Sequence, residues 1–328
     1  MRYFVALAAL AALAACSPYR LADSVENFHR SIAESQAALN TGIANLRADI
    51  TSNHTARFVA TRAKIQTSTG CGASSAADDK GNLYPPCVLL ARGEAEPTVS
   101  PVLQNEASAR RKMEVLLRYA DALKAISNAE DSKALTSATD KLAGSASGLV
   151  VAAAPAGPQA AAAAAAAGAT LAAAIEAGGT AVRIGLDAQR MAVLRRTVGD
   201  TNKPVRSVAI GIGSYFDTLR LARIEQVLAE TNFRAARLGL GPNKEYASDF
   251  AATQQKLDAL NAVREADGAK VGEDIATAHE KLVKAADDET GGPAEFAAAV
   301  GELATAVQKL RAAMEAQTKV GTTAKTGT

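Results

Sequence analysis

The chain of 328 residues contains no tryptophan, and its aromatic residues amount to only 4%. With so few large rings, there is little to fill a wide globular core or the interior of a β-sandwich. Alanine is abundant instead, and it combines the highest intrinsic helix propensity with a small side chain. The composition therefore predicts long, slim and closely packed helices.

Histidine is also scarce, since only His29, His54 and His279 are present. This excludes most histidine-dependent hydrolase sites. His279 and Glu280 begin a possible zinc motif, but Val283 stands where the second histidine is needed. The chain has no Gly-x-Ser-x-Gly elbow and no phosphate loop ending in Gly-Lys-Ser/Thr. We therefore expect no catalytic residue, no cofactor and no metal site, and predict that the protein is not an enzyme.

A strong charge of one sign is missing too, because the formal net charge is only +2. No attraction to nucleic acid follows from that total. The charge is uneven, however. Residues 183–237 hold ten basic and five acidic side chains, whereas residues 243–291 hold six basic and eleven acidic ones. Two interpretations stay open: neighbouring helices of opposite sign pair along their edges, or the basic helices face anionic lipid or another envelope polymer.

Charge is also absent from the start of the chain, where Val5 to Ala15 form an apolar run and Arg2 precedes them. Small residues then lead to a cysteine in Leu13-Ala14-Ala15-Cys16. This stretch resembles the lipobox of bacterial lipoproteins. The resemblance implies that residues 1–15 are a signal peptide and that Cys16 becomes the lipidated first residue. An ordinary cleaved signal peptide is the alternative, and the run is too short for a membrane-spanning helix.

The residue after Cys16 is Ser17, not aspartate. In Gram-negative lipoproteins, an aspartate at that position commonly signals retention at the inner membrane. The same resemblance therefore implies an outer-membrane location on the periplasmic side, with lipidated Cys16 as the contact to the membrane.

Two cysteines remain, Cys71 and Cys87, within a segment rich in glycine and proline. In an oxidising compartment such a pair usually forms a disulfide, although free thiols or a metal site remain alternatives. We expect residues 67–102 to be a loop held by this bridge. Cys87 to Leu90 is either a short strand or a buried run. The loop itself is a partner-binding tip or a plain connector.

Apolar residues recur in steps of three and four through most of the mature chain, which predicts about six helices. The predicted fold is all-α: an elongated antiparallel bundle over 16–317 with coiled-coil-like seams and a polar tail over 318–328 that frays. The seams serve internal packing alone or also assembly. The expected helices cover 19–66, 103–143, a third ending near 198, 204–238, a fifth beginning after 243 with a bend or split at Asp267-Gly268, and a last one with Phe296, Val300, Leu303, Val307, Leu310 and Met314 on one face.

Residues 142–175 contain no charged side chain and include eight consecutive alanines, 160–167. Pro155-Ala156-Gly157-Pro158 divides the segment. We interpret it as a helical hairpin packed against other helices. The alternative is a hairpin that enters the membrane, although each arm is shorter than the roughly 20 residues a span requires.

These features together predict a lipid-anchored, periplasmic, non-enzymatic envelope protein that acts as a scaffold or interaction module at the outer membrane. An envelope protein or a second copy of the chain is the expected partner. One alternative is a membrane-active helical protein that uses residues 142–175, which resembles the α-helical pore-forming toxins in outline. The other is an accessory subunit of an export or efflux assembly.

Overall fold

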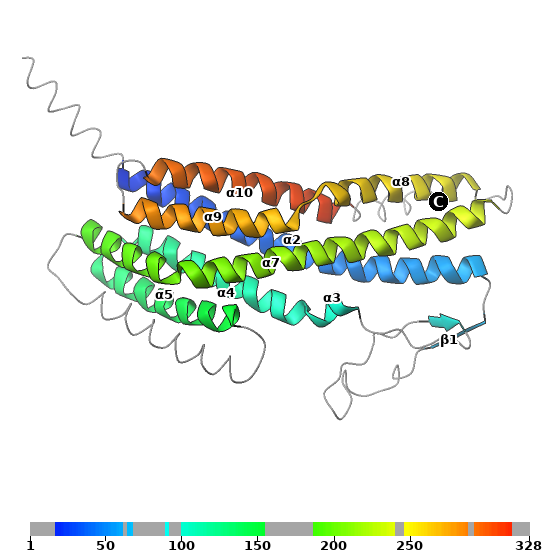
Figure 1. The fold of residues 1–328 in the computed structure, drawn as a ribbon, viewed down its shortest axis with the longest axis horizontal. Coiled ribbons are helices and arrows are strands. Elements are labelled where there is room, and N and C mark those ends of the chain that lie inside the picture. Colours follow the sequence, from blue (N-terminus) through cyan, green and yellow to red (C-terminus); the bar gives the residue numbers. More distant parts are fainter. Residues whose placement is uncertain are drawn as a thin grey trace, which may run out of the picture. The chain divides into compact units, whose positions relative to one another are not determined.

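The computed structural model describes residues 17–61, 64–67, 89–91, 100–154, 186–239, 246–287 and 292–316. Apart from two short strands, the elements in these ranges are helices (Figure 1), which confirms the predicted helical bundle. The helices are α2 (Ser17–Thr61), α3 (Pro101–Gln104), α4 (Glu106–Ser127), α5 (Ser132–Ala153), α7 (Leu186–Leu238), α8 (Tyr246–Glu265), α9 (Gly268–Asp287) and α10 (Gly292–Glu315).

The two strands are β1 (Ile65–Thr67) and β2 (Leu89–Ala91), which pair antiparallel with Ile65 opposite Ala91. Of the two possibilities for the run around Leu89, the strand is the one observed. This pairing brings Thr67 and Leu89 opposite each other in the part of the chain between α2 and α3. Cys71 and Cys87 lie outside the described residues.

The single helix predicted over 103–143 is wrong, because this part of the chain holds the end of α3, the whole of α4 and the first half of α5. α4 ends at Ser127, and Asp131 caps the start of α5 by accepting a 2.7 Å hydrogen bond from the backbone N–H of Ala134. An aspartate in this role satisfies a backbone donor that the first turn of a helix leaves unpaired. Apolar residues recur in steps of three and four on both sides of this turn, which is why the sequence pattern predicted one continuous helix.

The break predicted at residues 199–204 is also wrong, because α7 runs through Pro204 without interruption. A proline inside a helix lacks one hydrogen bond and costs about 3 kcal/mol. Buried side chains continue in helical register across this position and oppose that cost. They are Leu194, Val198, Thr201, Val205, Val208 and Ile212.

The split expected at Asp267-Gly268 is confirmed, since α8 ends at Glu265 and α9 begins at Gly268. Asp267 accepts a 2.9 Å hydrogen bond from the backbone N–H of Lys270, which starts the new helix. The predicted face of α10 is confirmed as well. All six of its apolar residues, from Phe296 to Met314, are buried.

The chain forms two compact units. Unit 1 comprises Met1–Ala37, Ser108–Ser214 and Asp267–Lys309, and unit 2 comprises Ala38–Ala107, Tyr215–Ala266 and Leu310–Thr328. Oppositely charged helices pair within each unit, as one interpretation of the charge pattern proposed. Arg195 of α7 lies 3.2 Å from Asp287 of α9 in unit 1, and Arg237 of α7 lies 3.1 Å from Asp249 of α8 in unit 2.

Small residues let the helices of unit 1 approach closely. At Gly272 of α9, an added Cβ would lie 2.5 Å from the carbonyl oxygen of Ala209 and 2.9 Å from Cα of Gly213, both in α7. Those neighbours are backbone atoms, which cannot rotate away. Large side chains fill the core elsewhere in the unit. The rings of Phe28 in α2 and Phe296 in α10 are buried, with centroids 6.3 Å apart.

Unit 2 is organised around a buried arginine. Arg223 of α7 is fully buried and donates to Oδ2 of Asp49 in α2 at 3.1 Å. Asn45 of α2 and Arg223 both donate to the backbone carbonyl of Met314 in the last turn of α10. Burial lowers the pKa of Arg223, and the Asp49 carboxylate opposes that shift. The guanidinium thereby joins three helices and satisfies a carbonyl that the helix end leaves unpaired.

The α7–α9 crossing generates a stability prediction. We expect Gly272→Ala to lower the free energy of unfolding by about 3 kcal/mol, because its Cβ would press on backbone atoms. Gly301→Ala in α10 is the matched control, since a Cβ at Gly301 meets nothing within 4 Å. That change should raise the same free energy by about 0.5–1 kcal/mol through helix propensity. Urea unfolding followed by circular dichroism measures both, and equal effects of the two substitutions would contradict the close crossing.

Candidate functional site

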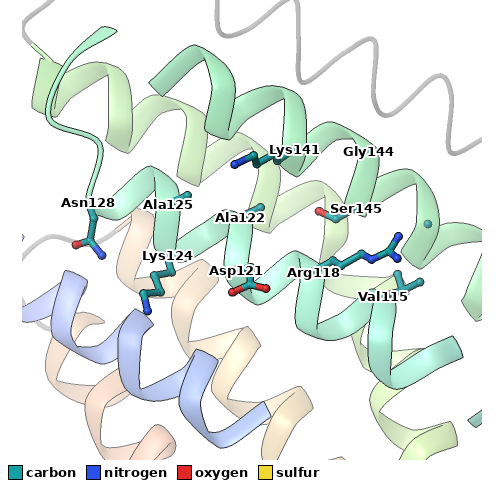
Figure 2. A pocket seen from close by; sticks show the side chains of 11 residues that line it. Val115, Arg118, Asp121, Ala122, Lys124, Ala125, Asn128, Lys141, Gly144 and Ser145 are labelled. Carbon is teal, nitrogen blue, oxygen red and sulfur yellow. The ribbon is translucent and has the colours of Figure 1, made fainter. Parts of the chain in front are cut away.

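A groove between α4 and α5 in unit 1 encloses about 820 Å³ (Figure 2). The two helices form an antiparallel hairpin, because the turn at Asn128–Asp131 reverses the chain. Gly148 of α5 allows close approach at the other end of the hairpin, where an added Cβ would lie 3.1 Å from Cγ1 of Val115 in α4. The groove is therefore a consequence of the capped turn that replaces the single helix predicted from the sequence.

The groove is lined mainly by small and apolar groups. α4 contributes Val115, Ala122 and Ala125, and α5 contributes Gly144 and Gly148. A Cβ at Gly144 would meet nothing within 4 Å, so the space above this glycine is open. The missing side-chain volume at these positions is what makes the surface concave.

Charged side chains stand along the walls. Two of them are engaged with α2: Lys124 lies 2.8 Å from Oε2 of Glu26, and Asp121 lies 2.7 Å from Nε2 of His29. The hydrogen bond from Lys124 is the main cause of a lowered pKa for the Glu26 carboxyl.

Two cations remain on the walls of the groove. Arg118 of α4 pairs with Glu114, one turn away on its own helix, and with no other acidic residue that the structure describes. Lys141 of α5 is exposed and has no ion pair within the part of the chain that the structure describes. Figure 2 shows Arg118 and Lys141 on opposite walls. The groove thus combines an apolar floor with a rim of three cations, Arg118, Lys124 and Lys141, and one carboxylate, Asp121.

A second polar cluster lies inside unit 1. The Tyr119 hydroxyl is 2.7 Å from both Nε2 of His279 and Oγ1 of Thr201, and Nδ1 of His279 donates to Oδ1 of Asn202 at 3.2 Å. With Nδ1 carrying the proton, Nε2 accepts from the tyrosine hydroxyl. Tyr119, Thr201 and His279 are fully buried. The cluster joins α4, α7 and α9 through satisfied hydrogen bonds.

Burial sets the ionisation of this cluster. It raises the pKa of the Tyr119 hydroxyl, and it lowers the pKa of His279 from 6.5 to about 3. Both groups are therefore neutral near pH 7. Because neither side chain has exposed surface, they are closed to a substrate, and their contribution is to the packing of three helices.

A third group of charges surrounds Glu230 of α7 in unit 2. Burial alone would raise the pKa of this carboxyl, but the charge and hydrogen bond of Lys256 and the hydrogen bonds of Ser52 and Arg234 together lower it. Lys256 of α8 lies 2.9 Å from Oε2 of Glu230, and Arg234 lies 2.8 Å from Oε1. The carboxylate thus holds α8 against α7, which is a structural role.

The residues predicted as sites from the sequence are not among those the structure describes. Cys16, Cys71 and Cys87 all lie outside the described ranges. Sequence reasoning missed the α4–α5 groove, because it placed one continuous helix there. The signal that could have revealed it is Asp131-Ser132 after Asn128, a helix-start pattern. Within the ranges given above, no three histidine, cysteine or acidic side chains come together as metal ligands.

Comparisons with protein families, with curated proteins and with solved structures found no match. None of the helices described here is both long and apolar enough to cross a bilayer.

The buried histidine predicts a pH dependence. Its pKa is about 3 in the folded protein and 6.5 as the ordinary value, so the unfolded chain takes up a proton first as the pH falls. The contribution of His279 to the free energy of unfolding is therefore fully present above pH 6.5 and falls as the pH is lowered towards 3. At pH 5 the free energy of unfolding is lower by about 2 kcal/mol. His279→Gln should remove this component from the difference in unfolding free energy between pH 7 and pH 5. Urea titrations at the two pH values measure it, and an unchanged difference in the variant would refute the assignment.

Proposed function

We propose that the protein is a lipid-anchored, periplasmic envelope protein whose helical body acts as a scaffold or interaction module at the outer membrane. The observation that carries this proposal is the lipobox-like Leu13-Ala14-Ala15-Cys16 directly before α2, which begins at Ser17. Only the peptide bond between Cys16 and Ser17 separates the lipidated residue from the helix. Several acyl chains on one residue give stable membrane attachment.

A non-enzymatic role is supported by the polar chemistry of the described helices. Their buried charged and aromatic groups are engaged in joining helices, as at Arg223, Glu230 and Tyr119. The α4–α5 groove is an exposed feature with a defined shape. An open groove on a helical body favours binding of a partner over conversion of a substrate.

The membrane-active alternative receives less support. The uncharged segment 142–175 begins within α5, where Leu142, Ala146 and Leu149 are buried in unit 1. Side chains that already pack inside the unit would have to leave it before they could enter a bilayer, and exposing them to water on the way is unfavourable. The rest of this segment, from residue 155 onward, lies outside the described residues.

The proposed anchor is tested by two substitutions. Metabolic labelling with palmitate should mark the wild-type protein, which should sediment with outer-membrane vesicles. Cys16→Ala should remove the label, because the residue that the proposal assigns to lipidation has lost its thiol. Ser17→Asp should keep the label and shift the protein to inner-membrane vesicles. A labelled Cys16→Ala variant, or a wild-type protein found in the soluble fraction, would contradict the proposal.

We further propose the bridge between Cys71 and Cys87 within residues 67–102. In an oxidising compartment, closing a loop of this size stabilises a protein by roughly 3 kcal/mol in the chain-entropy model. Alkylation of the unfolded mature protein should add two more alkyl groups after reduction than before it, as measured by mass spectrometry. Cys71→Ser with Cys87→Ser is the control that should show no difference. Equal alkylation of the wild type with and without reductant would disprove the bridge.

A further inference from the structure

We infer that the groove between α4 and α5 seats an amphipathic α-helix of a partner protein, with aliphatic side chains on its floor and carboxylates paired to Arg118 and Lys141. This inference deepens the proposed scaffold function and rests on it, because it names the chemistry of the partner. It does not depend on the lipid anchor.

The shape of the groove matches a helix. Its lining positions on α4 recur at Val115, Arg118, Ala122 and Ala125, in steps of three and four, so they form one face of the helix. α5 contributes a facing row from Lys141 to Gly148. From Val115 to Asn128 the trough extends for about 20 Å along the helix axis. A third helix of three to four turns laid in this trough would complete a local bundle.

The floor determines which side chains the partner presents. The space above Gly144 is open, and the partly exposed Ala125 faces it from α4, so small residues on a partner would not fill this part of the groove. Large aliphatic side chains at helical spacing would insert into this space, as in helix-in-groove recognition. Filling it removes apolar surface from water on both partners, which supplies most of the affinity.

The positions of the charges favour a helix over a lipid. The Gly148–Val115 contact places Lys141 across from Ala122, one turn along from Arg118. The two cations therefore stand near the middle of the trough and on opposite walls. An acyl chain carries its charge at one end, whereas an amphipathic helix carries acidic side chains on both flanks of its apolar face. Charge complementarity of this kind sets specificity for the partner.

The experiment uses two synthetic peptides of about 18 residues and the whole mature chain carrying Cys16→Ser, so that lipidation does not influence the result. One peptide has leucines at helical spacing flanked by glutamates, and its twin has lysines in place of the glutamates. Fluorescence anisotropy of the labelled peptides gives the affinities. We expect the glutamate peptide to bind at least about fivefold more tightly than the lysine peptide.

Substitutions in the groove then test the site. Arg118→Ala with Lys141→Ala should abolish the preference, and Arg118→Glu with Lys141→Glu should invert it. Gly144→Leu fills the open space and should weaken binding at least about tenfold. Gly301→Leu in α10 is the matched control, because its Cβ also meets nothing within 4 Å, and it should bind like the wild type.

Three results would overturn the inference. They are equal affinity for the two peptides, identical binding by Gly144→Leu and Gly301→Leu, and binding of neither peptide. If sodium oleate bound while both peptides failed, the groove would be assigned to lipid. None of these outcomes depends on palmitate labelling at Cys16, so failure of the groove and failure of the anchor are distinguishable.

Discussion

Close packing between helices that carry small side chains is the constraint on which unit 1 depends. Gly213 and Gly272 bring α7 and α9 into backbone contact, and no side chain fits between them. This approach lets few large residues enclose a core, which matters in a chain with only 4% aromatic residues. Two of the rings, Phe28 and Phe296, are fully buried and pack against each other. Small volume and close approach thus replace large side chains as the means of excluding water.

Buried polar groups add specificity to this packing. The Tyr119–His279–Asn202 cluster in unit 1 and the Arg223–Asp49 pair in unit 2 each require particular helices in a particular register. A displaced helix would leave a charge or a hydroxyl without a partner in the interior, which is expensive. Contacts between alanine, leucine and valine are not directional, so one helix could slide along another and form similar contacts in a different register. The polar contacts are therefore the features that select one arrangement from many similar ones.

Small side chains also produce the concave surface to which we assign a role, the α4–α5 groove. Where small residues face a neighbouring helix, as at Gly148, they bring it closer. Where they face outward, as at Gly144, the same lack of side chain leaves a hollow. The α4–α5 groove is thus made from the residue types that hold the bundle together, with Arg118 and Lys141 added at its edges. A scaffold built in this way binds through shape and charge and needs no reactive group.

Much of the helical content was predictable from the sequence, since alanine content and three-four spacing determine which segments become helices. The face of α10 and the split at Asp267 followed from local pattern and capping alone. The continuity of α7 through Pro204 did not, because it depends on which side chains become buried when other helices arrive. The turn at Asn128–Asp131 had a local signal in Asp131, but the apolar periodicity on both sides of it favoured one continuous helix. His279 shows the same division: its sequence neighbours excluded a zinc motif, but its partners Tyr119 and Asn202 come from distant helices. Local periodicity determines the elements, and tertiary packing decides where they end, which polar groups meet and where a groove remains.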